Sequence, residues 1–104
     1  METEHFVYFI STRERKGMQP VKIGYSKDPE KRLKRLQTGH PNRLEVMKMV
    51  KCASEKDGRK LEKTLHWLAK RKFQKLNGEW FIINGSWQKL IKDCVKMCRV
   101  EIIE

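Results

Sequence analysis

The sequence lacks the features that mark membrane, secreted and multidomain proteins. No apolar run approaches the roughly twenty residues that cross a bilayer. No apolar leader precedes the first strand-like run, and no repeat or low-complexity tract interrupts the chain. Its 104 residues are enough for one compact domain and too few for two domains of ordinary size. We therefore predict a single intracellular, cytoplasmic domain, residues 1–104, with no membrane partner.

Cysteine is scarce and odd in number: the chain has Cys52, Cys94 and Cys98. An odd count without a leader argues against a secreted disulfide scaffold and favours a reducing compartment. Cys94 and Cys98 are spaced for one face of a helix, but no paired His or second Cys pair lies near them to complete a zinc site. We predict that these cysteines are small buried apolar residues.

Acidic residues are also few, 13 Asp and Glu against 24 Lys and Arg, which leaves a formal charge of +11. So large an imbalance in a short chain favours a polyanionic partner, and nucleic acid before a merely soluble basic surface. The sequence has no zinc finger or helix-turn-helix unit, so we expect phosphate contacts without sequence reading and binding that weakens with salt.

Two short runs rich in aromatic and β-branched residues predict the first two strands. They are HFVYFI, residues 5–10, and VKIGY, residues 21–25, joined by a charged loop. We predict that they form an antiparallel hairpin with a long connection. Lys22 interrupts the second run, and alternation along the strand turns its side chain away from the side of Val21 and Ile23.

Capping residues and leucine spacing predict three helices. The signals are Asp28 and Pro29 with Leu33, Leu36 and a stop at Gly39 for the first; Ser54 and Asp57 with Leu61, Leu65 and Leu68 for the second; and Ser86 with Leu90, Ile91, Cys94, Val95, Met97 and Cys98 for the third. Residues 43–53 alternate imperfectly and predict a third strand, and residues 79–83 predict a short extended piece. We predict an α/β (α+β) fold: a three-stranded, mainly antiparallel sheet flanked by helices.

Several of these segments carry a family resemblance because their motifs occur in a fixed order. They are Val7-Tyr8, Lys22-Ile23-Gly24, SKDPEKRLKRL at residues 26–36, Leu61-Glu62 with His66, and GEWF at residues 78–81. The chain resembles the GIY-YIG nuclease superfamily, in its phage-associated branch with a KIG second motif and an LQTG-P segment. The resemblance covers residues 5–83 as a catalytic core and leaves 84–104 as a C-terminal helix and tail.

The resemblance implies a GIY-YIG-like fold and a metal-dependent endonuclease that uses Mg²⁺ or Mn²⁺ to hydrolyse DNA, leaving a 5′-phosphate and a 3′-hydroxyl. It also suggests a phage-encoded protein. Two residues depart from the pattern: Phe6 stands where the name-giving glycine would be, and Lys22 replaces a tyrosine. The alternative is a catalytically inactive nucleic-acid-binding module with the same fold. RNA as the partner, and a monomer or a homodimer, stay open.

The resemblance assigns Tyr8 to activation of the attacking water, Arg32 to the phosphate oxygens and Glu62 to one divalent cation. A tyrosine with its pKa near the usual value of roughly 10 is a poor base at neutral pH and needs a nearby cation. Lys22 is the candidate, provided that the hairpin register places it beside Tyr8. The alternatives are a core tyrosine and an outward lysine on an edge strand.

Arg32 suits a phosphate because its planar guanidinium donates two parallel hydrogen bonds, although a solvated basic helix face is the ordinary alternative. Glu62 lies at the border of the leucine stripe, and one carboxylate with waters and phosphate oxygens is a usual Mg²⁺ environment. An exposed Glu paired with a lysine is the alternative. His66, one turn later, is an auxiliary that positions water, protonates the leaving oxygen or contacts the metal, or else a structural histidine.

The remaining candidates lie around this set. We predict nucleic-acid contacts at Arg13, Arg15, Lys16, Arg35 and His40, and a site border at Tyr25, Asn77 and Glu79. For His40 a plain turn residue is the alternative. Trp80 and Phe81 are expected to close the core.

Overall fold

The computed structural model describes residues 4–12, 19–83 and 87–103, apart from the side chains of residues 19 and 87. Within them the chain forms a six-stranded antiparallel sheet in the spatial order β4-β5-β2-β1-β3-β6. The strands are β1 (His5–Thr12), β2 (Gln19–Ser26), β3 (Leu44–Cys52), β4 (Gln74–Lys75), β5 (Trp80–Ile83) and β6 (Ile102–Ile103). The predicted α+β class and the central antiparallel strands are confirmed.

The predicted strand number is wrong, because the sheet extends beyond β1, β2 and β3. The extended piece predicted at residues 79–83 pairs with β2 as β5, from Gln19↔Ile83 to Lys22↔Trp80. β4 and β6 add two residues each at the two edges. Such short strands carry too little alternation to be recognised in a sequence, and only their backbone pairing defines them.

The three predicted helices are present as α1 (Pro29–Gln37), α2 (Glu55–Lys72) and α3 (Trp87–Cys98). The side chain of Asp28 accepts a hydrogen bond from the Lys31 N–H, and that of Ser54 accepts one from the Asp57 N–H, both at 3.1 Å. These contacts satisfy backbone donors that a helix start leaves unpaired. The two predicted caps are therefore confirmed, while the third, Ser86, lies outside the described residues.

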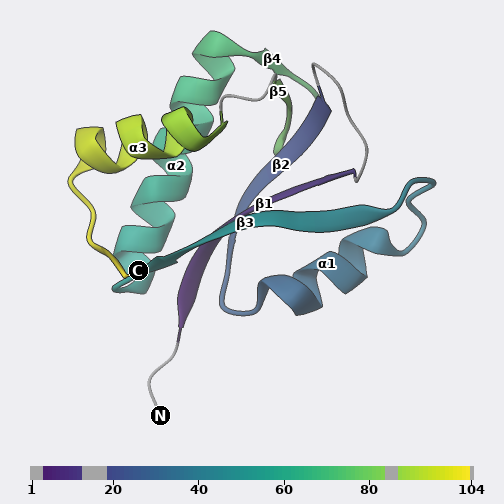
Figure 1. Ribbon diagram of the computed structural model, residues 1–104, viewed down its shortest axis with the longest axis horizontal. Coiled ribbons are helices and arrows are strands. Elements are labelled where there is room, and N and C mark those ends of the chain that lie inside the picture. The colour runs from purple at the N-terminus through teal and green to yellow at the C-terminus, as the bar shows by residue number, and fades with distance from the viewer. Residues whose placement is uncertain (1–3, 13–18, 84–86, 104) are drawn as a thin grey trace.

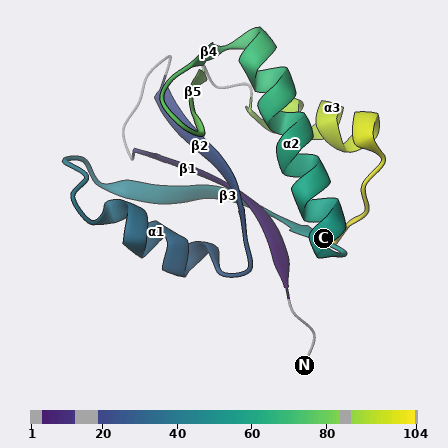
Figure 2. The same cartoon turned by 180° about the vertical axis from the view of Figure 1, so that it is seen from behind.

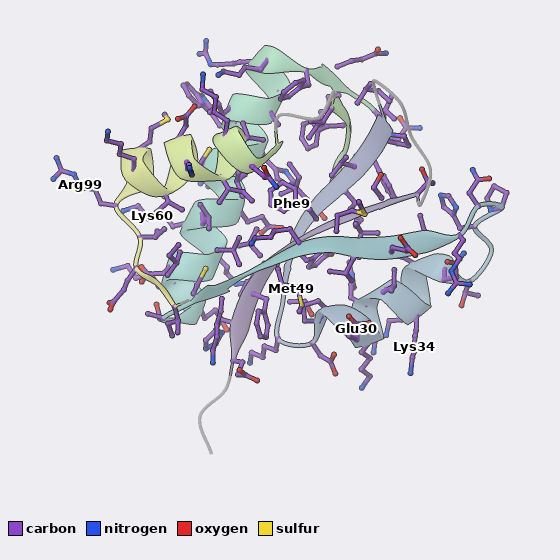
Figure 3. The ribbon with its side chains drawn as sticks, viewed as in Figure 1. Phe9, Glu30, Lys34, Met49, Lys60 and Arg99 are labelled. Carbon is purple, nitrogen blue, oxygen red and sulfur yellow. The ribbon has the colours of Figure 1, made fainter. Side chains whose placement is uncertain are left out.

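The helices cover opposite faces of the sheet: α1 lies on one face, and α2 and α3 lie on the other (Figures 1 and 2). The larger core fills the space beneath α2 and α3, and its buried members include Phe9, Ile23, Leu61, Leu65 and Cys94. In Figure 3, Phe9 points into this core, whereas Lys34 on α1 points away from the sheet. Each fully buried Leu or Phe stabilises the fold by roughly 1.5–3 kcal/mol.

A smaller cluster lies between the sheet and α1. It consists of Tyr8, Ile10 and Leu44, with Leu33, Leu36, Val46 and Trp80 packed against them. Period-two alternation separates the two clusters, since Val7 and Phe9 point to one face and Tyr8 and Ile10 to the other. Tyr8 therefore lies on the α1 side, where Arg32 is also located.

All three cysteines are buried and free, as predicted. Burial raises the pKa of the Cys52 thiol to about 11 and that of Cys94 to about 12, so both stay protonated at neutral pH. Cys94 and Leu90 bring α3 into the larger core. No helix among the described residues has the length and apolar character needed to cross a membrane.

Candidate active site

The candidate site forms at the outer edge of β2, where its pairing with β5 ends. Beyond Lys22, the backbone of Ile23 donates to the carbonyl of Glu79 at 3.2 Å and accepts from Nε2 of His66 at 2.7 Å. The N–H of Tyr25, two residues further along β2, donates to the Glu62 carboxylate. The strand edge thus fixes Glu62 and His66 of α2, because its outward backbone groups need partners.

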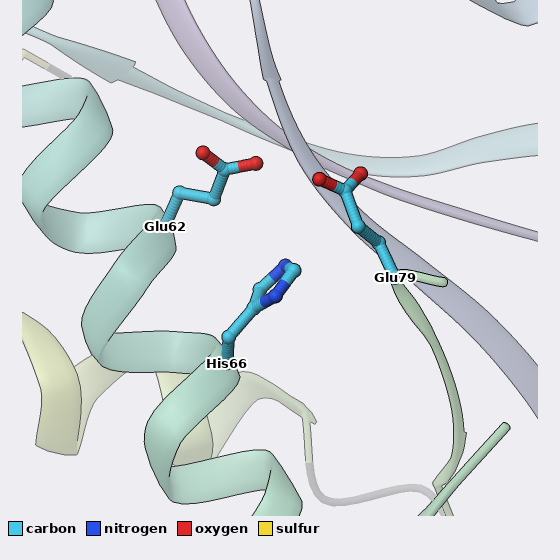
Figure 4. A group of neighbouring side chains, drawn as sticks. All are labelled: Glu62, His66 and Glu79. Carbon is cyan, nitrogen blue, oxygen red and sulfur yellow. The ribbon is translucent and has the colours of Figure 1, made fainter. Parts of the chain in front are cut away.

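Glu62, His66 and Glu79 converge at this edge (Figure 4). One ligand atom from each lies within 4.8 Å of the others, and all three side chains are partly buried. Glu62 and His66 lie one turn apart on α2, and Glu79 comes from the segment that leads into β5. Two carboxylates and an imidazole held this close form a donor set suited to a divalent cation.

The contact of His66 with the Ile23 carbonyl identifies which ring nitrogen carries the hydrogen. A carbonyl only accepts, so Nε2 carries the hydrogen and the neutral ring keeps its lone pair on Nδ1. Histidines that bind metals commonly donate their other ring N–H to a backbone carbonyl in this way. The His66 ring is held on another side by Phe81. The two rings meet edge to face, with their centroids 5.3 Å apart.

Tyr8 reaches the same edge from the neighbouring strand because its cross-strand partner is Gly24. A Cβ atom on Gly24 would overlap with the hydroxyl and Cζ of Tyr8, so only glycine lets the ring lie across β2. The glycine of the KIG motif therefore places the Tyr8 hydroxyl close to Glu62 and Glu79. The side chain of Tyr8 is 1% exposed.

The pKa of Tyr8 is raised above its usual 10.0, chiefly by burial. A hydrogen bond with Arg32 and its charge oppose this shift, and the carboxylates of Glu79 and Glu62 reinforce it. The phenol is therefore neutral at physiological pH in the free protein. Arg32 is the cation that acts on it, and this contact joins α1 to the site.

The pKa of Glu62 is also raised above its usual 4.5, first by burial and then by the neighbouring Glu79. His66, Arg59 and the hydrogen bond from the Tyr25 N–H act in the opposite direction. A partly buried carboxylate next to another carboxylate is a group that gains from a bound cation.

Lys22 lies on the predicted side of its strand and is 8% exposed. It is paired across the hairpin with Ile10, next to the Tyr8–Gly24 pair, so it shares a sheet face with Tyr8. Its Nζ lies 3.2 Å from Oε2 of Glu79 and 5.8 Å from the centroid of the Trp80 ring. The charge of Lys22 is therefore matched to Glu79, and its action on Tyr8 stays a prediction.

A basic pocket of about 320 Å³ adjoins Arg32, between the N-terminal ends of α1 and α2. Five cations line it, together with Tyr25, Ser26 and Asp28: Lys27, Lys31, Arg32, Arg35 and Arg59. Arg35, a predicted nucleic-acid contact, thus lies beside Arg32. The five cations of this pocket can donate hydrogen bonds to phosphate groups on one side of the site.

The other predicted residues lie around Glu62, His66 and Glu79 rather than among them. His40, in the loop after α1, stacks on Trp80 with ring centroids 6.0 Å apart. Asn77 is exposed, and its carbonyl accepts from the Trp80 N–H. The Tyr25 ring points to the α2 side, where its hydroxyl is hydrogen-bonded to His5 Nδ1 at 2.6 Å. Tyr25 therefore contributes to the site through its backbone N–H, which donates to Glu62. Arg13, Arg15 and Lys16 lie outside the described residues.

Sequence reasoning missed three members of the basic pocket: Lys27, Lys31 and Arg59. Lys27 and Lys31 look like any lysine of a basic run. Arg59 lies 27 residues after Arg32 in the sequence and is brought close by the packing of α2, where its guanidinium lies 4.7 Å from the Tyr25 ring centroid. No local pattern marks such a contact.

Comparison with known proteins adds a family to this geometry. No curated protein and no solved structure matches the chain. The T5orf172 domain matches residues 5–99, which include every described residue of the site. The chain therefore belongs to the T5orf172 domain family, a phage-associated domain related to nuclease-like families.

Proposed function

We propose that this protein is a metal-dependent endonuclease of the GIY-YIG type that hydrolyses DNA phosphodiester bonds. The observation that carries the proposal is the meeting of Glu62, His66 and Glu79 within 4.8 Å at the strand edge that Tyr8 and Arg32 also reach. The family membership and the five cations of the basic pocket support a nucleic-acid substrate. Both the GIY-YIG assignment and the metal dependence belong to this proposal.

The chain's own residues supply binding and proton transfer. Arg32 and the basic pocket hold the phosphate oxygens and stabilise the charge that develops on them. Tyr8 would take a proton from the attacking water, and the charge of Arg32 favours the phenolate that this requires. The water oxygen bonds to phosphorus, the bond from phosphorus to the 3′ oxygen breaks, and the leaving 3′ oxygen takes up a proton. The resemblance implies that a 5′-phosphate and a 3′-hydroxyl are left.

The donor set fits a divalent metal ion. Glu62 would be its principal ligand, with Glu79 and His66 as neighbours, and a bound cation would offset the burial that raises the pKa of Glu62. When bound, Mg²⁺ or Mn²⁺ polarises a phosphate oxygen or the leaving group. The imidazole favours Mn²⁺ over Mg²⁺, because Mg²⁺ prefers an all-oxygen environment.

The test is cleavage of supercoiled plasmid with Mg²⁺ or Mn²⁺ by the wild type and by Arg32→Ala and Glu62→Ala. We expect both variants to lose about 10²–10³-fold in rate, since each removes one stabilising charge or ligand. Lys60→Ala, an exposed change on the same helix as Glu62, is the matched control and should cleave normally. Equal inertness of wild type and variants, with DNA binding retained, contradicts the proposal.

The alternative function is a nucleic-acid-binding module without turnover, and two observations favour it. Tyr8 is 1% exposed and its pKa is raised, so it is a poor base in the free protein. The carboxylate of Glu79 is already paired with Lys22. A binding module would retain affinity in Glu62→Gln and show no metal-dependent product. Cleavage assays on single-stranded, duplex and branched DNA and on RNA separate the two functions and define the substrate.

A further inference from the structure

A large groove lies away from the candidate site, at the opposite edge of the sheet. It measures about 1180 Å³ and runs between α3 and the outer edge of β3, beside β6. Apolar side chains form much of its wall: Val50 of β3, Ile91 and Val95 of α3, and Ile102 of β6. Met49 and Ile103 also border the groove and are 42% and 45% exposed, with their side chains on the other face of the sheet.

Lysines surround this apolar surface. Lys48 comes from β3 and Lys89, Lys92 and Lys96 come from α3, and all four side chains are exposed. Lys51 also lines the groove and forms an ion pair with Glu4 at 2.8 Å. No carboxylate is among the described residues that line the groove. Its potential is therefore positive, and it selects for a ligand that is acidic and apolar.

The edge of β3 provides a third element of recognition. β6 pairs with β3 only at Lys51 and Cys52, and no other strand of the described part pairs with residues 46–50 on that side. The N–H of Ala53 donates to the Glu101 carbonyl at 3.1 Å, so alternation along β3 turns the backbone groups of Met49 outward as well. Figure 3 places Met49 on this open strand. An exposed strand edge is a template for an added strand.

We propose that this groove binds an extended acidic segment of a partner protein, whose apolar and acidic side chains both lie on the face toward α3, as an additional strand beside β3. Its backbone pairs with the β3 edge, its apolar side chains pack against Ile91 and Val95, and its carboxylates meet the lysines. Two other occupants fit less well. A second copy of this chain would bring +11 against lysines. A nucleic acid would find neither arginine nor an aromatic ring for stacking among the lining residues.

The experiment uses the full chain and a fluorescein-labelled short peptide that carries Glu and Val at every second position, with Thr between them, and measures fluorescence anisotropy. We expect saturable binding that weakens about tenfold in the double variant Lys92→Glu/Lys96→Glu, because two attractions become repulsions. Lys60→Glu/Lys70→Glu, two exposed positions on α2, is the matched control and should bind normally. Plasmid cleavage should be unchanged in both variants, so the result is independent of the proposed nuclease function.

Two further probes test the mode of binding and the class of partner. A peptide with N-methylated amides on one edge should lose binding about tenfold or more, because it cannot pair with β3. No saturable binding of the Glu–Val peptide up to about 1 mM overturns the proposal. Equal binding of the N-methylated peptide overturns strand addition. A thymidine oligonucleotide whose binding is lost in Lys92→Glu/Lys96→Glu, with no peptide binding, would assign the groove to nucleic acid.

Discussion

At the scale of single residues, the candidate site is built from groups that are costly to hold in the free protein. The pKa of Glu62 is raised by burial and by Glu79, and that of Tyr8 is raised by burial despite Arg32. A carboxylate whose pKa is higher in the folded state than in the unfolded chain destabilises the fold above that pKa. Sites that are organised to bind charge commonly carry such a cost in stability.

The first prediction concerns Glu62→Gln in the metal-free protein. Removing the partly buried charge should raise the Tm by roughly 2–5 °C at neutral pH while metal-dependent cleavage is lost. The gain should disappear as the pH falls through the raised pKa of Glu62 towards the unfolded value of 4.5, because the wild-type carboxyl is then protonated. Thermal melts in EDTA across this pH range measure both effects.

Glu55→Gln is the matched control for this prediction, since Glu55 is exposed on the same helix. It lies in the first turn of α2, where a negative charge is favourable, so its loss should lower the Tm slightly. An equal rise of the Tm in both variants would mean that the gain in Glu62→Gln does not come from the site.

A second prediction concerns Lys22→Met, which preserves an apolar strand position. Loss of the ammonium leaves Glu79 without its partner at 3.2 Å, and the bare carboxylate then acts on Glu62. The pKa of Glu62 should rise further, so the acid limb of the cleavage profile should move to higher pH. A pH profile of kcat/KM measures the shift, with Lys60→Met as the exposed control. An unchanged profile and unchanged activity at neutral pH would mean that Lys22 is structural.

At the scale of elements, three segments meet at one strand edge. β5 pairs with β2 only as far as Lys22, which leaves the outward backbone groups of Ile23 and Tyr25 to His66, Glu79 and Glu62. α1 delivers Arg32 to the opposite face, where Gly24 lets Tyr8 lie across the strand. The point at which the pairing between β2 and β5 ends therefore determines the position of the site.

The third prediction tests how α1 positions Arg32, which lies one turn after the capping residue. Asp28→Ala removes the acceptor for the Lys31 N–H and should cost about 1 kcal/mol of unfolding free energy, with slower cleavage as the first turn loosens. Asp28→Asn removes the same charge but still caps, so it should behave like the wild type. Urea denaturation and plasmid cleavage measure the two effects. Equal loss in both variants would indicate a role for the charge rather than the cap.

At the scale of the whole molecule, cations gather at two distinct surfaces of the described structure. The basic pocket beside Arg32 combines lysines with arginines, whereas the groove between α3 and β3 combines lysines with aliphatic side chains. Guanidinium groups bind phosphates through paired hydrogen bonds, and an apolar groove does not. The first surface therefore suits nucleic acid and the second suits an acidic protein segment.

The fourth prediction is the salt dependence of DNA binding. If the five cations of the basic pocket contact phosphates, the slope of log K against log salt concentration should be roughly −4.5 for duplex DNA. Lys31→Ala/Arg35→Ala should make this slope shallower by about 2, whereas Lys60→Ala/Lys70→Ala on α2 should leave it unchanged. Titrations by anisotropy at several salt concentrations measure the slopes. Equal changes in both double variants would indicate diffuse attraction rather than contacts in the pocket.

Local sequence signals determined much of this protein. The strands at residues 5–10 and 21–25, the caps Asp28 and Ser54, and the burial of the cysteines follow from alternation, capping chemistry and apolar spacing, which act over a few residues. The ordered motifs also indicated which residues to bring together. Contact between them is a separate matter, because it depends on packing between segments distant in the chain.

The tertiary structure alone decided the partners. It widened the sheet to six strands, because backbone edges are satisfied by any strand that packing brings alongside, even one of two residues. It paired Lys22 with Glu79 through the register of β2 against β5, and it brought Arg32 to Tyr8 through the packing of α1 on the sheet. The order and spacing of the motifs indicated the charged residues of the site, and packing between distant segments decided which of them face one another.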